Sequence, residues 1–576
     1  MVYMIRVDKH IRGLVISAEG GVDRNAKTRH LQRQLIAHQT FVAGGRLIAP
    51  IEAVGTVFDV LGLEGVVWDD GLLHSARRQH DHRQMQMRAR LEVALALEDP
   101  HFVLAGYDML HRLDEHQAEA VAAIVMPSLK GIAIFDEQGT GKTIMALSAF
   151  DFLREREQIQ RLLVIAPKSV LVAWQAQCKE FLGDKYRVGI VTGSAERRRR
   201  TIKGNYDILL VGYEAAIQEE SLLSVTVNAK PLSYILVIDE SYFVKNPETA
   251  RSQSVSRIRG ACERAVVLCG SPVPNSAVDV VNQIDLADGG VAFAGITIPK
   301  DSDAAYEKIA GALQNAIFLR RLKEDVLPDI PLKQIEKVYS SLAPRQRVMY
   351  ERARDELIIE VRSVDDRQFT QRLSSFLTKR VRLLQICSNP RMLDPKYDEE
   401  PAKLSILDRM LKELVEEQSK KVVIWSYYRM SLDEIATRYS RYGVARIDGT
   451  VLRIEDRLAA VENFQHDPHT RVFVGNAAAA GAGITLTSAH HAIYESFSNQ
   501  AAHYMQSVDR IHRRGQTEQV VSHVLIATGT IEEYEYRRLL RKEQSGKQLL
   551  GDKYEEPVTR ERFLAELEGA EKTSFR

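Results

Sequence analysis

Two short stretches, far apart in the sequence, hold residue types that suit the binding and hydrolysis of a nucleoside triphosphate. The first, residues 136–143, is a glycine-rich loop that ends in a lysine and a threonine. The second, residues 506–513, contains Arg510 and Arg513, three apart on an expected helix, so that they share one face. Residues so distant in sequence meet on one triphosphate only if two lobes close around it. The two stretches therefore predict an ATP-driven motor that acts on nucleic acid.

The glycine-rich loop has the residues of a phosphate-binding loop. Its glycines let backbone N–H groups turn inward around phosphates, and the helix expected after it points its positive end at them. The lysine would reach the β and γ phosphates, and the threonine hydroxyl would ligate Mg²⁺. A plain glycine-rich turn is the alternative, which the preceding apolar run and the following helical pattern disfavour. The nucleotide-binding residues predicted from this loop are Gly139, Thr140, Gly141, Lys142 and Thr143.

Two adjacent carboxylates, Asp239 and Glu240, close the apolar run Tyr234–Ile238. Asp239 can hold Mg²⁺ together with Thr143, directly or through water, and Glu240 can polarise the attacking water. Such a pair at a strand end often does no more than cap the strand. Downstream of a phosphate loop in the same sheet, the pair predicts the metal ligand and the general base of an ATPase.

Arg510 and Arg513 suit the role of arginine fingers, which reach a nucleotide from a second lobe. Hydrolysis spreads charge over the γ-phosphate, and planar guanidinium groups stabilise that charge when the lobes close. Such a finger typically contributes about 10³–10⁵ in rate. A basic, solvated helix is the alternative for residues 510–514. The predicted catalytic residues are Lys142, Asp239, Glu240, Arg510 and Arg513.

Short apolar runs that alternate with helical patterns must position these residues. Continuous apolar strands separated by helices are typical of parallel sheets that are buried on both faces. One series precedes residue 269 and another follows residue 420, and each supplies enough strands for one doubly wound lobe. We therefore predict an α/β fold with two doubly wound parallel-sheet lobes. The expected strands are 131–135, 162–166, 207–211, 234–238 and 265–268, then 421–426, 471–474, 492–494 and 520–525.

The same patterns divide the chain into five parts. A length of 576 residues already favours two to four domains. Between the two series the periodicity is mostly helical, and the first hundred or so residues belong to neither series. The predicted parts are a small N-terminal accessory domain (1–105), lobe 1 with the ATP site (106–298), a helical connector (299–402), lobe 2 with the arginine fingers (403–552) and a C-terminal tail (553–576).

The overall charge of the chain does not indicate a nucleic-acid partner. Seventy-eight Lys and Arg residues stand against 77 Asp and Glu residues, for a formal charge of +1. Any nucleic-acid surface must therefore come from local clusters. Two basic stretches, Arg77–Arg90 and Glu196–Arg200, could make phosphate contacts. Solvated helices are the alternative for both.

Cysteine use and hydropathy favour a cytoplasmic protein. The four cysteines include no C-x-x-C pair, which disfavours a zinc knuckle or a disulfide framework and favours a reducing compartment. No run approaches the roughly 18 apolar residues of a membrane span, and charge appears too early at the N-terminus for a secretion signal. We expect no metal other than nucleotide-bound Mg²⁺, no membrane contact, and a bacterial or phage setting.

Further short motifs follow the phosphate loop in a fixed order, and together they resemble the Swi/Snf family of helicase-like ATPases in helicase superfamily two. The resemblance covers roughly residues 106–552. Gln117 matches the glutamine that reads adenine, Pro167–Ser169 with Trp174 resembles a block that touches one nucleic-acid strand, and Leu319–Val326 resembles a stretch specific to that family. The short spans between motifs are similar to those of compact, annealing-helicase-like members. Further matches are Asp239–Tyr242, Gly270–Pro272, Asn275, Lys421–Tyr427, Asp448–Gly449, Gly481–Gly483, Gln506–Gln516 and Thr530–Glu533.

The resemblance implies RecA-like lobes, ATP and Mg²⁺ as cofactors, and translocation along double-stranded or branched DNA without routine strand separation. Contacts to the phosphate backbone carry no sequence code, so binding should be sequence-tolerant and salt-sensitive. By the family's motifs, Gln117, Gly483 and Gln506 join the nucleotide-binding residues. The implied nucleic-acid-binding residues are Lys168, Ser169, Asn275, Ser426 and Asn476.

Several positions depart from the expected patterns. Asp136 stands where the general phosphate-loop pattern has glycine, Tyr242 replaces the family's usual histidine, and Ser271 replaces its usual threonine. The acidic pair Asp114 and Glu115 lies where the family often has a basic residue. None of these changes removes a phosphate ligand, a Mg²⁺ ligand or a finger. They put the coupling between hydrolysis and movement in doubt.

Other functions fit part of the pattern. A strand-separating helicase on DNA or RNA would need a separation wedge, which we do not find. An interaction scaffold with a weakened motor is disfavoured by the complete catalytic set. The motor subunit of a bacterial or phage restriction or defence assembly would take its nuclease from a partner. Residues 1–105 could bind DNA or a partner protein.

Overall fold

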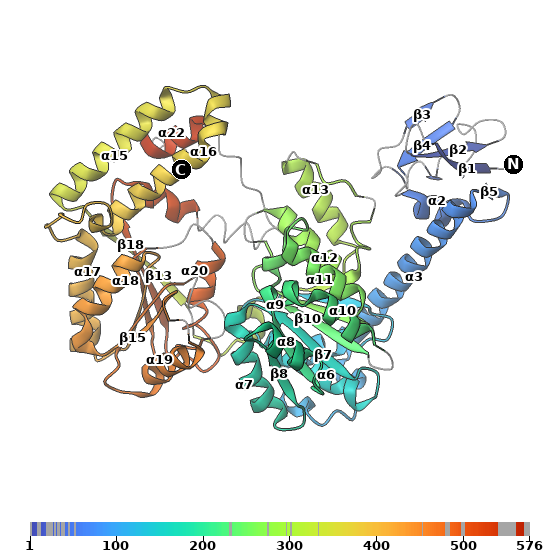
Figure 1. The fold of residues 1–576 in the computed structure, drawn as a ribbon, viewed down its shortest axis with the longest axis horizontal. Coiled ribbons are helices and arrows are strands. Elements are labelled where there is room, and N and C mark those ends of the chain that lie inside the picture. Colours follow the sequence, from blue (N-terminus) through green and yellow to red (C-terminus); the bar gives the residue numbers. More distant parts are fainter. Residues whose placement is uncertain are drawn as a thin grey trace.

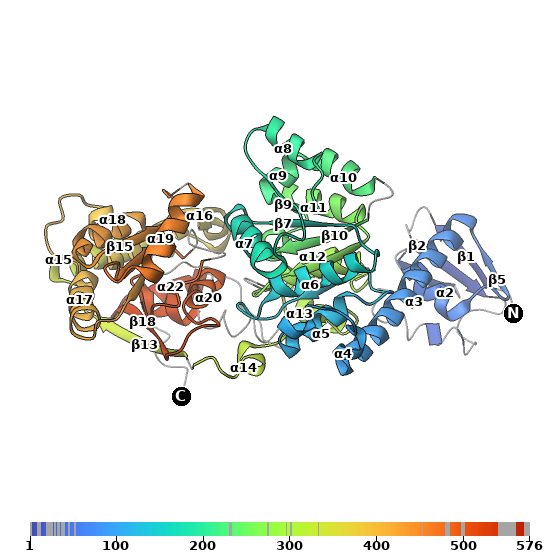
Figure 2. The ribbon, with the colours of Figure 1, turned by 90° about the horizontal axis from the view of Figure 1, so that it is seen from below.

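The structure is a computed structural model with two large lobes and a smaller N-terminal domain at the end away from lobe 2 (Figures 1 and 2). It describes residues 53–538 except 230–232, 274–275, 295, 300–301, 332, 452, 478–483 and 497–500. It also describes residues 3–8, 13–18, 27, 30–31, 35, 41–43, 46–50 and 560–568.

Lobe 1 is built on a parallel sheet with the strand order β12-β6-β11-β10-β7-β9-β8. Successive residues of β6, and Phe135 directly after it, point to opposite faces. Ile132 and Ile134 pack with α5, α6 and α7, whereas Ala133 and Phe135 pack with α9, α10, α11 and α12. Both faces are therefore covered, as the continuous apolar strands predicted. The strands are β6 (Gly131–Ile134), β7 (Arg161–Ala166), β8 (Val188–Val191), β9 (Ile208–Gly212), β10 (Tyr234–Asp239), β11 (Arg264–Leu268) and β12 (Phe318–Leu319). The helices are α5 (Glu115–Ile124), α6 (Lys142–Glu155), α7 (Leu171–Leu182), α8 (Ala195–Ile202), α9 (Tyr213–Gln218), α10 (Glu220–Asn228), α11 (Ala250–Gly260), α12 (Val281–Asp288) and α13 (Ser302–Leu313).

Lobe 2 is also parallel and doubly wound, with the strand order β13-β18-β17-β14-β16-β15. Two apolar cores, one on each face of the sheet, take alternate residues of its central strands. The strands are β13 (Lys333–Ser340), β14 (Val422–Trp425), β15 (Val444–Ile447), β16 (Val472–Gly475), β17 (His491–Tyr494) and β18 (Val520–Ala527). The helices are α17 (Ala402–Leu411), which continues as a π-helical turn (Lys412–Glu417), α18 (Arg429–Arg438), α19 (Ile454–His466) and α20 (Ala501–Val508).

The α/β fold with two doubly wound parallel lobes is thus confirmed, and each of the nine predicted strands is present. Four strands of these two sheets were not predicted, β8, β12, β13 and β15, and each lies at a sheet edge. Edge strands are only half covered: β8, β13 and β15 mix intermediate or exposed residues with buried ones, and both residues of β12 are half-buried. They therefore lack the unbroken apolar run that revealed the central strands.

The connector predicted as helical contributes more than helices. It supplies β12 to the edge of lobe 1 and β13 to the edge of lobe 2, and the short helix α14 (Lys323–Val326) lies between these two strands. Beyond β13, α15 (Pro344–Arg362) and α16 (Asp366–Ser388) pack against each other. The C-terminal helix α22 (Arg560–Glu568) joins their core through Phe563 and Leu567. Part of the predicted tail is therefore a packed helix.

The N-terminal domain has a five-stranded sheet in the order β3-β4-β2-β1-β5, antiparallel except for the pair β1 and β5. Its elements are β1 (Tyr3–Asp8), β2 (Gly13–Ala18), β3 (Phe41–Ala43), β4 (Arg46–Pro50), α2 (Val54–Leu61) and β5 (Val66–Trp68). The long helix α3 (Asp70–Glu98) leads from this domain to lobe 1 (Figure 1), followed by the short α4 (Pro100–Val103). Ala89, Val93 and Ala96 of α3 belong to the lobe 1 core. A boundary between the N-terminal domain and lobe 1 near residue 70 accounts for this packing better than one at residue 105. The boundary at residue 105 stays a prediction.

Candidate active site

The central strands of lobe 1 bring the predicted phosphate loop and carboxylates to one edge of the sheet. β11 lies between β6 and β10, with Leu268 paired to Ile134 on one side and to Asp239 on the other. The three strands therefore end level with one another, and the loops that follow them leave from the same edge. In open α/β sheets, ligands bind outside the carboxyl ends of the strands.

The phosphate loop has the backbone shape that its glycines predicted. Gly139 and Gly141 have φ values of 89° and 90°, in the left-handed region that glycine adopts without strain. A Cβ atom at Gly141 would lie 2.2 Å from Gln117 Nε2, so a larger residue would displace the Gln117 side chain. Helix α6 begins at Lys142, and its positive end faces the cavity lined by Gly141, Lys142 and Thr143.

Lys142 is buried and is held by the phosphate loop itself. Its Nζ donates to Asp136 O at 2.8 Å and to Glu137 O at 3.0 Å. Burial lowers the pKa of Lys142, and the nearby Glu240 carboxylate opposes that shift. A buried ammonium that rests on neutral carbonyls has much to gain from an anion, so a phosphate in the cavity would compete for it.

Gln117 lies against the phosphate loop at the start of α5. Its Oε1 accepts from Asp114 N at 3.1 Å, which completes a capping box, and its Nε2 donates to Thr140 O at 3.1 Å. The Thr140 hydroxyl in turn donates to Glu137 O at 2.9 Å. Gln117 thus ties α5 to the loop, and its role in adenine binding stays a prediction.

The two carboxylates lie side by side in a buried, polar corner. Asp239 Oδ2 accepts from Trp174 Nε1 at 2.8 Å, and Glu240 Oε1 accepts from Gln138 Nε2 at 3.2 Å. Burial raises the pKa of Asp239, and burial together with the Asp239 charge raises the pKa of Glu240 to about 7. Glu240 also has a φ of 50°, a strained conformation that persists where surrounding contacts hold it.

The predicted fingers reach this corner from lobe 2. One cavity of about 100 Å³ is lined by Lys142, Thr143, Asp239 and Glu240 of lobe 1 and by Arg510 and Arg513 of lobe 2. The expected helix is wrong at this point, because α20 ends at Val508. Short turns follow it, with Arg510 N bonded to Ser507 O and Ile511 N to Val508 O. Both arginines nevertheless face the same cavity.

Arg510 and Arg513 differ in how they are held. Arg513 Nη1 donates to Thr485 Oγ1 at 3.1 Å. Arg510 is buried, and its Nε has no hydrogen-bond partner among the described residues. Burial and the neighbouring Arg513 lower the pKa of Arg510 to about 10. A buried donor without a partner is rare in proteins, and a phosphate oxygen would satisfy it.

The side chains at the cavity fit a triphosphate with its metal ion. Arg510 Nε, which has no partner in the part of the chain that the structure describes, is suited to an anion. The two carboxylates with raised pKa values are suited to a cation. Gln506 reaches across to lobe 1, where its Nε2 donates to the Tyr242 hydroxyl at 3.4 Å. The predicted nucleotide ligand Gly483 lies outside the described residues.

The four described residues among the predicted nucleic-acid contacts are divided between the two lobes. Lys168 and Ser169 are exposed in lobe 1, and Asn476 of lobe 2 donates to Tyr427 O at 2.8 Å. Ser426 is buried and donates to Glu495 Oε2 at 2.7 Å. Its hydroxyl proton is therefore already hydrogen-bonded within lobe 2. Asn275 lies outside the described residues.

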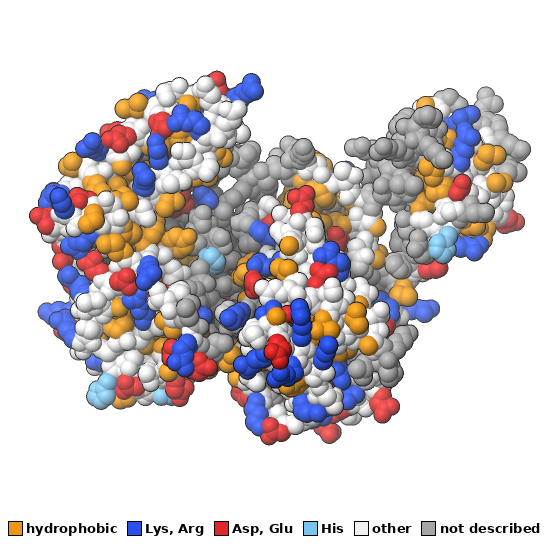
Figure 3. All heavy atoms as spheres, in the orientation of Figure 1, with side chains coloured by type: hydrophobic (Ala, Val, Ile, Leu, Met, Phe, Trp, Pro, Cys, Tyr) orange, Lys and Arg blue, Asp and Glu red, His pale blue; other side chains and the backbone are white. Residues whose placement is uncertain are grey.

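The basic run in helix α8 is largely paired within the protein. Figure 3 shows Lys and Arg side chains crowded over α8 with acidic groups among them. The buried carboxylate of Glu219 binds Arg198 at 2.9 Å and Arg199 at 3.0 Å. Arg200 pairs with Glu196 at 2.8 Å. Two carboxylates therefore offset about half of the charge of the four arginines, Arg197–Arg200.

Sequence reasoning missed several residues of this site. Trp174, expected beside a nucleic-acid strand, is buried and bonded to Asp239, and Gln138 bonds to Glu240. Asp136, which departs from the glycine pattern, is bound by Arg321 at 2.6 Å. Lys323 forms a buried ion pair with Asp509, next to Arg510. Only contacts that the fold creates reveal these roles, although the family-specific stretch 319–326 marked two of the residues.

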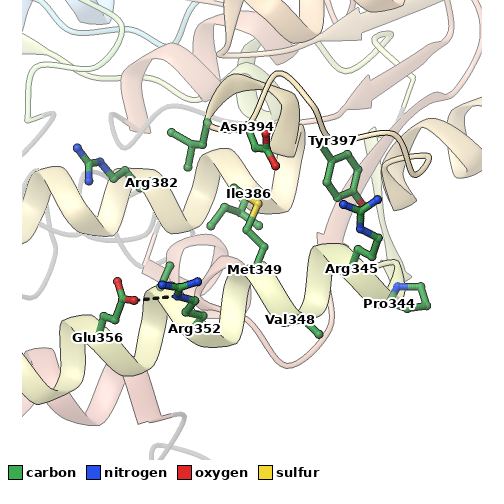
Figure 4. Close-up of a pocket in the computed structure, with 12 residues that line it drawn as sticks. Pro344, Arg345, Val348, Met349, Arg352, Glu356, Arg382, Ile386, Asp394 and Tyr397 are labelled. Atoms are coloured by element: carbon green, nitrogen blue, oxygen red, sulfur yellow. Dashed lines mark hydrogen bonds and ion pairs between the residues drawn. The ribbon is translucent and has the colours of Figure 1, made fainter.

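A larger cavity, of about 950 Å³, is lined by α15, α16 and residues 393–397 (Figure 4). Apolar side chains such as Val348 and Ile386 line it together with Arg345, Arg352 and Arg382. Arg352 is paired with Glu356. The lining has no phosphate loop and no carboxylate pair, so the smaller cavity between the lobes remains the candidate active site.

Comparisons with protein families match most of the chain. Residues 80–392 match the model of the SNF2-related domain, and residues 402–515 match the helicase conserved C-terminal domain. No described helix is both long and apolar enough to cross a membrane.

Curated relatives include proteins from yeast, bacteria and mammals. The ISWI chromatin-remodeling complex ATPase ISW1 of Saccharomyces cerevisiae is 29% identical over 75% of this chain and 40% of its own length. The putative ATP-dependent helicase/translocase YwqA of Bacillus subtilis is 29% identical over 70% of this chain and 45% of its own. The DNA annealing helicase and endonuclease ZRANB3 of Mus musculus is 26% identical over 73% of this chain and 39% of its own. The chain thus spans about two-fifths of the length of the curated relatives it matches.

Among solved structures, the Sulfolobus solfataricus SWI2/SNF2 ATPase core in complex with dsDNA is 23% identical, with a TM-score of 0.35. The match covers 76% of this chain and 96% of that one.

Proposed function

The chain belongs to the SNF2-related family, as its motifs predicted, and from that premise we propose that it is an ATP-driven translocase on double-stranded DNA. Its task in this proposal is to remodel protein–DNA or branched DNA structures. The observation that supports it best is the meeting of Lys142, Asp239 and Glu240 with Arg510 and Arg513 in one cavity between the lobes.

Each residue of the cavity has a role in the proposed hydrolysis. Lys142 and the N-terminus of α6 would bind the β and γ phosphates, while Thr143 and Asp239 would hold Mg²⁺. Bound Mg²⁺ would neutralise phosphate charge. Glu240 would accept a proton from the attacking water, and Arg510 and Arg513 would stabilise the charge that develops on the γ-phosphate. Gln117, Gly483 and Gln506 are proposed nucleotide contacts.

The track is proposed to be duplex DNA. The relatives include a chromatin-remodeling ATPase and a DNA annealing helicase, which supports duplex and branched DNA as substrates. Lys168, Ser169 and Asn275 of lobe 1 and Ser426 and Asn476 of lobe 2 are the proposed contacts. Contacts of this kind to the phosphate backbone would be sequence-tolerant and salt-sensitive.

We propose the N-terminal domain as an accessory domain that binds DNA or a partner protein. It lies at the end of the molecule away from lobe 2 (Figure 2), and α3 joins it to the motor. This position leaves the cleft between the lobes free of it.

The test is the ATPase rate without polymer and with duplex DNA, single-stranded DNA or RNA. Strong stimulation by duplex DNA, followed by displacement of a third strand from a triplex, would establish the translocase. Preference for single strands or RNA would favour a strand-separating helicase instead. Lys142→Ala is the control, because it removes the phosphate-binding ammonium and should abolish hydrolysis while leaving duplex binding intact.

A further inference from the structure

The stretch that leaves lobe 1 for lobe 2 has no role in the chemistry above, although its residues 319–326 resemble a family motif. Residues 319–331, here named the interlobe strap, run from β12 at the edge of lobe 1 toward β13 at the edge of lobe 2. The strap contacts the phosphate loop on one side and the turn that carries the fingers on the other.

Arg321 fastens the strap to the phosphate loop. Its Nη2 lies 2.6 Å from Asp136 Oδ2, and its backbone N donates to Asp136 Oδ1 at 3.1 Å. A further nitrogen, Nη1, donates to Glu119 Oε2 at 2.7 Å. The Asp136 side chain is fully buried, so a carboxylate there requires this partner. The departure from glycine at position 136 is thereby explained.

Lys323 links the phosphate loop to the finger turn. Its backbone N donates to Glu137 Oε2 at 2.8 Å. Its side chain crosses to lobe 2, where Nζ lies 2.5 Å from Asp509 Oδ1 and 3.0 Å from His512 O. The side chains of Lys323 and Asp509 are only 5% and 11% exposed, so this ion pair is poorly screened by solvent.

The two contacts of Lys323 lie directly beside the fingers. Asp509 precedes Arg510, and His512 precedes Arg513, in a segment that α20 no longer supports. The His512 ring is also bound to the strap, with Nε2 2.7 Å from Pro331 O. A Cβ atom at Gly139 would lie 3.4 Å from Lys323 Cε and 3.8 Å from Arg513 Cγ. Lys323 and Arg513 therefore lie so close to the phosphate loop that a side chain at position 139 would contact both.

We propose that Lys323 is a positioning residue for ATP hydrolysis, which holds the turn after Val508 so that Arg510 and Arg513 point at the phosphates. The inference rests on the proposed function of the cavity. Lys323 acts through Asp509 and His512 and does not itself touch the nucleotide. Because Glu137 anchors Lys323 and also accepts from Lys142, the finger turn is linked to the loop that senses the nucleotide.

The test compares Lys323→Met with Lys323→Arg in the full chain. Loss of the charge should lower kcat at least tenfold, and by no more than the about 10³–10⁵ that a finger contributes. The KM and the affinity for an ATP analogue should stay near those of the wild type. Lys323→Arg should recover most of kcat, because it restores the charge opposite Asp509. Lys420→Met is the matched control, since Lys420 forms an exposed pair with Glu518 at 2.7 Å in lobe 2.

A double-mutant cycle separates positioning from general destabilisation. Combined with Arg513→Ala, Lys323→Met should add little further loss, because groups that act as a unit are strongly non-additive. Independent, multiplicative losses would overturn the proposal, as would a kcat within twofold of wild type. If Lys323→Met does not fold, Asp509→Asn carries the same comparison. All rates are measured without DNA. A protein that hydrolyses ATP but is not stimulated by duplex DNA would contradict the proposed translocase, and this test of Lys323 would still be valid.

Discussion

At the scale of single residues, Glu240 combines two features that suit a general base. It has a left-handed backbone conformation, and its carboxylate is buried beside Asp239. These surroundings raise its pKa to about 7, near the working pH, where a base transfers protons most effectively. The same burial would be costly for a residue with only a structural role.

The raised pKa predicts how hydrolysis depends on pH. Below about pH 7 the free protein carries Glu240 protonated, and a protonated carboxyl cannot accept a proton from water. The kcat/KM for ATP should therefore rise with pH from about 6 to about 8, because kcat/KM reports the free enzyme. A pH–rate profile measures this directly.

Glu240→Gln identifies the residue responsible. The amide cannot act as a base, so the rate should fall by about 10²–10⁴, and the limb near pH 7 should vanish from the residual activity. A flat profile in the wild type, or an unchanged limb in the variant, would assign the base to another group.

Arg513 predicts a different kinetic signature. Arg513→Ala removes a guanidinium that acts on charge developing in the transition state, so kcat should drop by about 10³ or more while ATP still binds. Arg513→Lys should restore little, because an ammonium lacks the planar fork of donors. Single-turnover rates and titration with a fluorescent ATP analogue separate the two steps. A variant with near-normal single-turnover hydrolysis would exclude Arg513 as a finger.

At the scale of elements, the sequence predicted the central strands, which are buried on both faces of the sheet, and missed the edge strands, which are only partly covered. The central strands β6 and β14 are continuous apolar runs, and β10 and β17 contain apolar runs that stop one residue short of a strand end. Such unbroken runs are typical of strands buried on both faces. The edge strand β13 has mostly exposed residues, including Lys333 and Lys337, and its register becomes visible only beside β18. Its pattern resembles that of a solvated loop or helix.

The candidate site follows a similar division. Groups that must contact phosphate or metal, such as Lys142 and Asp239, have types and spacing that chemistry fixes, and they were found in the sequence. Groups that act on other protein groups, such as Trp174 and Lys323, were not assigned these contacts, because any well-placed donor could serve. Whether each predicted ligand touches nucleotide stays a prediction.

Helix α3 predicts where the chain can be shortened. A protein that starts at residue 70 keeps α3 whole and should retain folding and basal ATPase activity. One that starts at residue 106 loses Val93 and Leu104 from the lobe 1 core. A large buried apolar side chain contributes about 1.5–3 kcal/mol, against a total stability of about 5–15 kcal/mol.

Thermal melting and ATPase assays of the two truncations check this boundary. The shorter protein should melt well below the longer one or fail to fold. Equal stability of the two would place the boundary near residue 105, as the sequence patterns predicted, and would make the packing of α3 dispensable.

At the scale of the whole molecule, the closed lobes leave too little space for a nucleotide. The cavity between them measures about 100 Å³, whereas small-molecule sites usually occupy about 300–1,000 Å³. The Lys142 ammonium also donates hydrogen bonds to two carbonyls of the phosphate loop. Nucleotide entry therefore requires the lobes to part or the loop to rearrange. The exposed ion pair between Arg514 and Asp114, 2.7 Å long, opposes such opening by no more than about 1 kcal/mol.

The nearly neutral charge of the molecule predicts how it would hold DNA in the proposed function. With a formal charge of +1, the net charge supplies no long-range attraction to the duplex, so affinity must come from local phosphate contacts. Each such contact contributes about 0.9 to the slope of log affinity against log salt concentration.

Lys168 is exposed and should make one, so Lys168→Ala should reduce the slope by about that amount. Arg199→Ala is the matched control, because Arg199 already pairs with Glu219 within the protein and should contribute less to the slope than an unpaired cation. Duplex binding measured over a series of salt concentrations distinguishes the two. An equal change of slope in both variants would place the basic run of α8 on the DNA, and an unchanged slope for Lys168→Ala would remove the proposed lobe 1 contact.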